Sequence, residues 1–229
     1  MQVWAAFGIL CAFGSLCPTT IAQNPRKKPA ITALAITPDG AGFVHGSQAG
    51  VFYRLWNSES EKPIPTQLDN VHHLTFSPDG TILAVAGGSP GEFGAVELWS
   101  WPEHKLLGQL EGHDDLVYDA AWLGTQKVLV TASADRTIRV WDAAAGNSLV
   151  KLTGHSGPVL CLAVSPDGKL LCSGSADQTI RVWDTTNWQL VRSLTNHLGP
   201  VHSLTFVPAQ RDGLHAVPLA YLCSAGGDN

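Results

Sequence analysis

Charged residues are scarce in this chain of 229 amino acids. Asp, Glu, Lys and Arg make up 14% of the sequence, whereas a soluble domain usually carries about 25%. Acidic residues outnumber basic ones by 19 to 14, and the net charge of −5 gives no general attraction to nucleic acid or anionic lipid. There is one Met beside 23 Gly, and 45% of residues are hydrophobic. This composition excludes disorder and favours strands and tight turns over helices.

Cofactor and metal motifs are also missing. No Cys-x-x-Cys pair occurs, which excludes zinc ribbons, thioredoxin-like sites and the usual attachment motif of c-type haem. No glycine-rich phosphate loop, Gly-x-Ser-x-Gly or His-Glu-x-x-His occurs either. Beyond the N-terminal segment the cysteines are Cys161, Cys172 and Cys223, an odd number that indicates small buried strand residues. We therefore expect no cofactor and no metal site.

The N-terminal segment has the pattern of a secretory signal. Residues 3–16 are almost wholly apolar, and small residues stand just before residue 23, where a signal peptidase would cut. We therefore assign residues 1–22 to a signal peptide and 23–30 to a linker. This predicts an exported, periplasmic or extracellular protein with no membrane insertion once the leader is cleaved. No Lys or Arg precedes the apolar run, which leaves two alternatives: an uncleaved anchor formed by residues 3–22, or a true start further upstream.

A repeat of about 42 residues organises the rest of the chain. Trp, His and Leu residues each recur at this spacing, and a Pro-Asp-Gly turn marks three of the units. Independent series that agree in phase indicate a structural repeat. The series are Trp56, Trp99, Trp141 and Trp183; His113, His155 and His197; Leu110, Leu152 and Leu194; and the turns at 38–40, 78–80 and 166–168.

Each unit is predicted to form four short strands. In the fourth unit these are residues 159–164, 170–175, 179–184 and 189–194, which are rich in β-branched residues and bounded by Gly, Pro, Asp and Asn. Bulky residues alternate onto both faces of the third strand, which indicates a sheet packed on both sides. Four-stranded antiparallel sheets stacked around an axis satisfy this pattern, so the predicted fold is an all-β propeller.

The repeat resembles the WD40 family, whose signature is Gly-His near the start of a unit and Trp-Asp near its end. Gly112-His113 and Trp141-Asp142 of unit three match it, and unit four matches equally well. Units one and two lack Gly-His. The resemblance covers residues 31–229, which is about 4.7 units with an incomplete fifth blade. The chain thus resembles an exported, bacterial-type WD40 protein that is truncated, and we expect an unpaired strand edge and an uncovered blade face.

The repeated polar residues invite a catalytic interpretation, because hydroxyl, imidazole and carboxylate are the groups of a nucleophilic triad. The set recurs with a fixed period, however, whereas a catalytic site is needed once. The WD40 resemblance instead implies a buried chain in which Asp holds His, His holds Ser or Thr, and the hydroxyl holds the Trp N–H. We predict no catalytic residue. The structural sets are His113, Thr131, Asp135 and Trp141; His155, Ser173, Asp177 and Trp183; and His197, Ser224 and Asp228.

Candidate partner contacts lie where the repeat is irregular or where an exposed loop is expected. Two acidic residues follow the first Gly-His, on a loop type that WD40 proteins use for partners. The others belong to a long turn, to an insertion, or to the stretches after third strands, where we expect exposure. Ordinary loop variation is the alternative for each. The candidates are Asp114, Asp115, Phe93, Trp101, Trp188 and Arg211, and Asp119 is a candidate channel-lining group.

Together these features predict a rigid protein-interaction scaffold that is not an enzyme and binds no nucleic acid. The alternative is an accessory propeller of a longer enzyme or c-type cytochrome protein whose active domain lies outside this sequence. A third hypothesis is a small-ligand site in the central channel. The composition does not distinguish these functions; the scaffold role is what the WD40 resemblance implies.

Overall fold

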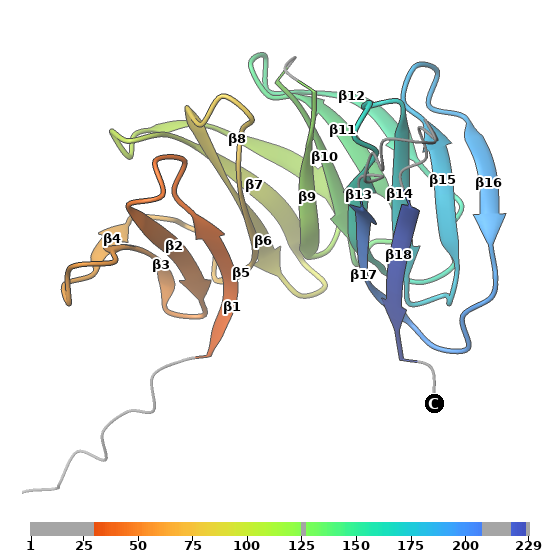
Figure 1. The fold of residues 1–229 in the computed structure, drawn as a ribbon, viewed down its shortest axis with the longest axis horizontal. Helices are drawn as coiled ribbons and strands as arrows, with labels where there is room; N and C mark the ends of the chain where they lie inside the picture. The colour runs from red at the N-terminus through yellow and green to blue at the C-terminus, as the bar shows by residue number, and fades with distance from the viewer. Residues whose placement is uncertain (1–29, 125–126, 208–220, 228–229) are drawn as a thin grey trace, which may run out of the picture.

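The computed structural model describes residues 30–124, 127–207 and 221–227, and within them every regular element is a β-strand (Figure 1). The strands form four four-stranded antiparallel sheets and one two-stranded sheet. The predicted all-β class with four-stranded blades is confirmed. The predicted signal peptide, residues 1–22, lies outside the described residues. Within the described part of the chain, no helix has the length and apolar character needed to cross a membrane.

Each blade adds its strands in chain order, from the inner strand to the outer one. Blade 1 contains β1 (Ile31–Ile36), β2 (Gly42–Ser47), β3 (Gly50–Leu55) and β4 (Lys62–Ile64); blade 2 contains β5 (Asn70–Phe76), β6 (Ile82–Ser89), β7 (Phe93–Ser100) and β8 (Leu106–His113). Blade 3 contains β9 (Val117–Leu123), β10 (Val128–Ser133), β11 (Ile138–Asp142) and β12 (Asn147–Leu152); blade 4 contains β13 (Val159–Val164), β14 (Leu170–Ser175), β15 (Ile180–Asp184) and β16 (Leu190–Leu194). The fifth sheet contains β17 (Val201–Val207) and β18 (Tyr221–Gly226).

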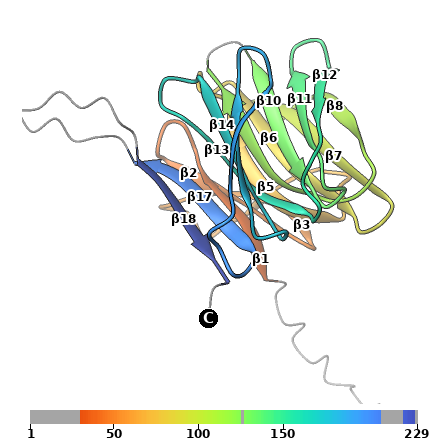
Figure 2. The same ribbon diagram turned by 90° about the vertical axis from the view of Figure 1, so that its right-hand side faces the viewer.

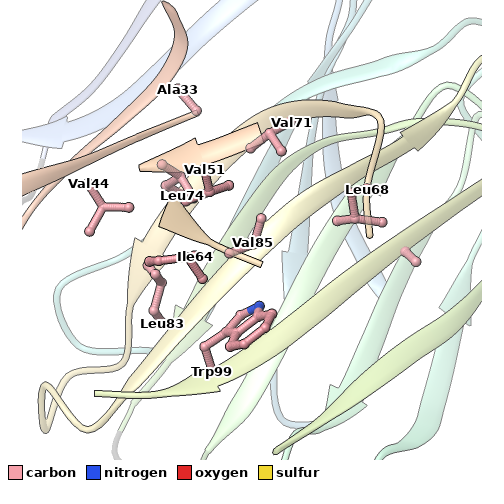
Figure 3. Packing of buried hydrophobic residues seen from close by; sticks show 11 residues of the cluster. Ala33, Val44, Val51, Ile64, Leu68, Val71, Leu74, Leu83, Val85 and Trp99 are labelled. Atoms are coloured by element: carbon pink, nitrogen blue, oxygen red, sulfur yellow. The ribbon is translucent and has the colours of Figure 1, made fainter. Parts of the chain in front are cut away.

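The hydrophobic core lies between successive blades. The inner strands β1, β5, β9, β13 and β17 contact one another in that order, so the blades follow each other side by side (Figure 1 and Figure 2). Between blades 1 and 2, Val44 and Val51 of one blade pack with Leu74, Leu83 and Trp99 of the next (Figure 3). The next three interfaces repeat this arrangement. Blades 2, 3 and 4 therefore bury both faces, as the alternation of bulky residues predicts.

The Pro-Asp-Gly turns join the first and second strands of blades 1, 2 and 4. In blade 2 the Ser77 hydroxyl donates to the Asp79 carboxylate over 2.6 Å, and the same carboxylate accepts the Thr81 N–H over 3.1 Å. These hydrogen bonds, that of Ser77 foremost, lower the pKa of Asp79 to about 2. Gly80 has a φ of 70°, the left-handed conformation that favours glycine. The turn therefore closes the hairpin without strain and sets its register.

Strand pairing corrects one member of the Trp series. Trp99 lies opposite Leu83 in the β6–β7 hairpin, but the corresponding position of blade 1, opposite Phe43, is Arg54. Trp56 lies beyond the end of β3 and is 59% exposed, whereas Trp99 is 4% exposed. The 42-residue spacing misleads here because the β6–β7 hairpin of blade 2 is longer than its counterparts.

One face of β1 stays uncovered among the described residues. Ile31, Leu34 and Ile36 are 58–62% exposed. By strand pairing, Ile31 and Leu34 correspond to Val71 and Leu74 of blade 2. Val71 and Leu74 are only 1% and 4% exposed. Val71 and Leu74 are buried because blade 1 packs on them, and no described strand packs on β1 in this way.

The cysteines differ in burial. Cys161 and Cys172 are buried, and burial raises the pKa of each thiol to about 12. Cys223, which we also expected to be buried, is exposed. The difference follows from its place on β18, because β17 is the only described strand that pairs with β18.

Candidate functional site

In blade 3 the predicted polar set forms one continuous hydrogen-bonded chain. The Nδ1 atom of His113 lies 2.8 Å from Asp135 Oδ2, and its Nε2 atom lies 2.7 Å from the Thr131 hydroxyl. The indole N–H of Trp141 donates to the same hydroxyl over 2.8 Å. His113 ends β8 of blade 2, whereas the other three belong to blade 3, so the chain ties two blades together.

Both nitrogens of the His113 imidazole have hydrogen-bond partners. The Asp135 carboxylate can only accept, so it accepts from Nδ1–H of His113. A hydroxyl has one hydrogen and two lone pairs, so Thr131 can accept the indole N–H and donate to Nε2 at the same time. Burial alone would raise the pKa of Asp135, but hydrogen bonds from His113 and Thr137 outweigh it and hold this pKa well below its ordinary value. The carboxylate and the hydroxyl together give both nitrogens of the buried imidazole a partner.

Blade 4 repeats the arrangement. His155 Nδ1 lies 2.9 Å from Asp177 Oδ2, His155 Nε2 lies 2.8 Å from the Ser173 hydroxyl, and Trp183 N–H donates to that hydroxyl over 3.0 Å. Burial lowers the pKa of His155, and the Asp177 carboxylate opposes this only in part. Burial would also raise the pKa of Asp177, but its hydrogen bonds, those from Thr179 and His155 first, keep this pKa well below the ordinary value.

Blade 2 satisfies its Trp in a different way. Val85 stands where blades 3 and 4 have Thr131 and Ser173. The indole N–H of Trp99 donates instead to Glu97 Oε2 over 3.0 Å, and Glu97 Oε1 accepts the backbone N–H of Gln67 over 2.8 Å. Glu97 is 1% exposed. We did not single it out from the sequence, although Glu-Leu-Trp in place of Arg-Val-Trp is a visible departure at this position.

The sets of the end sheets are less complete within the described residues. In blade 1 the hydroxyl position is taken by His45, whose Nε2 lies 3.6 Å from Glu61. In the fifth sheet His197 Nε2 lies 2.8 Å from the Ser224 hydroxyl. The predicted third member of that set, Asp228, lies outside the described residues.

The loops next to the blade 3 network carry three of the candidate partner residues. Asp115 accepts the N–H of Gly91 over 2.8 Å, which joins the long β6–β7 turn to the loop between β8 and β9. The N–H of Asp114 donates to Asp135 Oδ2 over 3.2 Å. Asp114 is exposed and Phe93 is 38% exposed. The structure thus brings two acidic residues and an accessible aromatic side chain to one end of blades 2 and 3.

The other candidate contacts are placed differently from our expectation. Trp101 is half-buried, with its ring centroid 5.1 Å from those of both Tyr53 and Phe76. Trp188 is half-buried against the core between blades 3 and 4. Neither is exposed as expected, because each fills space between two blades. Arg211 lies outside the described residues.

The inner strands line a groove of about 610 Å³. Asp119, the candidate channel-lining residue, is at its wall, where Oδ1 lies 2.9 Å from His73 Nδ1 and Oδ2 accepts the Leu162 N–H over 2.7 Å. These three residues belong to blades 2, 3 and 4. No cluster of potential metal ligands occurs in the described part of the chain. The carboxylate therefore joins three blades across the groove wall.

This combination of four-stranded blades and recurrent His, hydroxyl, Asp and Trp chains defines a propeller-type repeat protein. The family model for the WD domain, G-beta repeat (WD40) matches residues 104–142 and 146–184. Both matches begin before the outer strand of one blade and end with the third strand of the next. Residues 104–142 and 146–184 are therefore similar to WD40 repeats.

Three relatives illustrate the similarity. WD repeat-containing protein 1 of Xenopus tropicalis is 34% identical over 82 residues, which cover 34% of this chain and 13% of that protein. Striatin-4 of Homo sapiens is 34% identical over 139 residues, covering 51% and 18%. An uncharacterized WD repeat-containing protein of Synechocystis sp. is 32% identical over 120 residues, covering 51% and 33%. The matched region is therefore a third or less of these relatives.

Proposed function

We propose that the chain is an exported protein-interaction scaffold whose partner contacts the surface formed by Phe93, Asp114 and Asp115, here called the rim surface. The observation that carries the proposal is the hydrogen bonding beneath this surface. Asp135 binds both His113 and the N–H of Asp114, and Asp115 holds the neighbouring turn through Gly91. A loop held in this way loses little conformational entropy on binding.

A structural rather than catalytic role for the polar chains is supported by their burial. The His113 side chain is 1% exposed and that of Asp135 5% exposed, so a substrate has no access to either. Both imidazole nitrogens already have partners. The same chain recurs in blade 4 with its own buried His155. Two copies of one buried arrangement fit a device that holds loops in place.

Export is proposed from the apolar segment at residues 3–16. The test is the N-terminal sequence of the protein recovered from separate cell fractions. A start at Gln23 in the exported fraction is the expected result. Intact Met1 in the membrane fraction would replace cleavage by anchoring, and intact Met1 in the cytosol would overturn export.

The partner surface is tested by placing the photo-cross-linking residue p-benzoylphenylalanine at Phe93 in the full chain in its own cells. We expect a discrete cross-linked protein, whose yield falls at least fivefold when Asp114 is changed to Lys. The matched control places the same cross-linker at Leu149, which is 55% exposed on the outer strand β12. No discrete product at Phe93, or an equal yield of the same product at Leu149, would contradict the proposal.

A further inference from the structure

A groove of about 420 Å³ lies between blades 2 and 3, lined by aliphatic residues together with Gln109 and Lys127. Ile82, Leu98 and Leu110 of blade 2 form one wall, and they are 6%, 2% and 1% exposed. The turn of residues 143–146 in blade 3, which reads Ala-Ala-Ala-Gly, forms the other wall. Leu107 also lines the groove and is 53% exposed. This surface lies outside the rim surface.

The same turn carries a larger side chain in the neighbouring blades. The N–H of Gly146 donates to the Asp142 carbonyl over 2.8 Å, and the N–H of Trp188 donates to the Asp184 carbonyl over 2.7 Å. In blade 2 the equivalent residue is His104, whose N–H donates to the carbonyl of Ser100 over 3.0 Å. The φ angles of Gly146, Trp188 and His104 are 72°, 59° and 54°. The three residues therefore occupy one structural position.

The blade 3 surface against which Trp188 packs corresponds to the blade 2 wall of the groove. Strand pairing makes Val140 and Leu152 of blade 3 equivalent to Leu98 and Leu110 of blade 2. Val140 and Leu152 belong to the core cluster against which Trp188 packs. At the interface of blades 3 and 4, the protein thus fills this position with its own indole ring.

Aromatic rings also fill the corresponding position between blades 1 and 2. Tyr53 of blade 1 is the counterpart of Leu98, because it pairs opposite Val44 as Leu98 pairs opposite Ala84. Its ring lies 5.1 Å from Trp101 and 5.7 Å from His104, both in the turn of blade 2. Aromatic rings therefore occupy this position in the interfaces on both sides, whereas between blades 2 and 3 the turn of blade 3 brings only Ala143–Ala145 and Gly146 to it.

The charge at the groove indicates which group should lie next to an aromatic ring bound there. Lys127 lines the groove and is exposed. Within the described part of the chain it makes no salt bridge, although its charge acts on Asp79. A carboxylate beside the inserted ring would complement this ammonium group.

We propose that the groove between blades 2 and 3 binds an aromatic side chain, best an indole, that lies next to an acidic residue of a protein partner. The partner's ring would take the position that Trp188 takes between blades 3 and 4. This proposal rests on the scaffold function proposed above and adds a second contact site to it. Aromatic anchors seated in pockets dominate the binding energy of many protein interfaces.

The experiment is methyl NMR of the full chain labelled at alanine methyl groups, titrated with N-acetyl-L-tryptophanamide. We expect the methyl signals of Ala143, Ala144 and Ala145 to shift, and N-acetyl-L-leucinamide to shift them at least fivefold less at equal concentration. N-acetyl-L-tryptophan, which carries a carboxylate, should bind more tightly than the amide. Lys127→Met should remove this difference. Absence of shifts, or equal shifts with the leucine compound, would overturn the proposal.

Blocking the groove provides the matched variants. Gly146→Trp places the ring of the neighbouring blade in the groove, and a Cβ atom at this glycine meets nothing within 4 Å. It should weaken binding of the tryptophan compounds at least tenfold. Gly40→Trp is the control, because Gly40 has a φ of 67° and equally open space but lies in blade 1. Unchanged binding in a folded Gly146→Trp protein would overturn the proposal.

A third variant and the cross-linking experiment separate the two proposals. If Gly146→Trp does not fold, Leu107→Asp places a charge at the exposed edge of the groove and should reduce binding to the same extent. Cross-linking through Phe93 together with absent tryptophan binding would refute the groove alone. Tryptophan binding at Ala143–Ala145 without any cross-linked partner would instead refute the scaffold function and, with it, a partner for the groove.

Discussion

The Thr131 hydroxyl joins groups from three strands, because it binds His113 at the end of β8 and Trp141 on β11 while itself lying on β10. All three side chains are buried. A buried polar group that loses its partner retains the full cost of its desolvation. The loss of this one oxygen therefore leaves two buried groups without their partner.

A reciprocal pair of isosteric substitutions tests this role. Thr131→Val should lower the free energy of unfolding by about 1–3 kcal/mol, because His113 and Trp141 both lose their partner. Val85→Thr, at the equivalent position of blade 2, should also destabilise, because the Trp99 N–H is already bound to Glu97 and the added hydroxyl enters an apolar site. Urea unfolding measures both. Neutral Thr131→Val would contradict the account.

The buried His155 makes stability depend on pH. Its folded pKa lies below the ordinary value of 6.5, so the unfolded chain takes up the proton first and stability falls as the pH drops below 6.5. Asp135 and Asp177 also have lowered folded pKa values, so the stability they contribute above their ordinary value of 3.8 is lost below it.

Urea unfolding between pH 7.5 and 3 checks the direction of this effect. His155→Gln should flatten the fall that begins at pH 6.5, whereas His202→Gln, at an exposed histidine, should leave it unchanged. Stability that rises as the medium is acidified would refute the assignment of a neutral, buried imidazole.

At the scale of the element, two turn glycines form a matched pair. Gly80 and Gly168 both have a φ of 70°, so alanine at either costs about 1–2 kcal/mol from the left-handed conformation. A Cβ atom at Gly80 would also lie 2.8 Å from Pro38 Cβ, whereas at Gly168 it meets nothing within 4 Å. Gly80→Ala should therefore be the more destabilising variant by about 1 kcal/mol or more. Equal effects in thermal unfolding would show that the Pro38 contact relaxes freely.

Trp99 and Trp56 lie at the ends of equivalent hairpins but should contribute differently to stability. Trp99→Ala should cost about 3–5 kcal/mol, because the side chain is buried between blades. Trp56→Ala should cost about 1 kcal/mol, since this ring is exposed and loses its contact with Phe43, 4.9 Å between centroids, and a solvent-exposed hydrogen bond to the Gly40 carbonyl. Chemical denaturation of both variants checks the difference. A loss of unfolding free energy for Trp56→Ala as large as that for Trp99→Ala would contradict the exposed position of Trp56.

These elements also show what the sequence could predict. The members of the polar chains of blades 3 and 4 could be found from the sequence, because each recurs after 42 residues, and the WD40 resemblance implied how they are connected. The position of Arg54 and the role of Glu97 could not be predicted in this way, because blades 1 and 2 differ in loop length and in their polar residues. The burial of Trp101 and Trp188 depends on the surface of a neighbouring blade, which no local pattern describes.

At the scale of the whole molecule, contacts between blades organise the structure. The core clusters lie between blades, and His113 and His155 each reach from one blade into the next. Asp119 adds a link across blades 2, 3 and 4. Because the polar chains lie beneath the loops between blades, a defect in one chain should loosen the loop above it and leave the next blade intact.

The most direct test of this account is hydrogen–deuterium exchange in the Thr131→Val protein. Asp135 accepts the N–H groups of Asp114 and Thr137, whereas Asp177 accepts those of Ser156 and Thr179 in the next blade. We predict at least tenfold faster exchange at the first two amides and unchanged exchange at the second two. Unchanged exchange at Asp114 and Thr137 in the variant would show that the buried chain does not hold the rim surface in place.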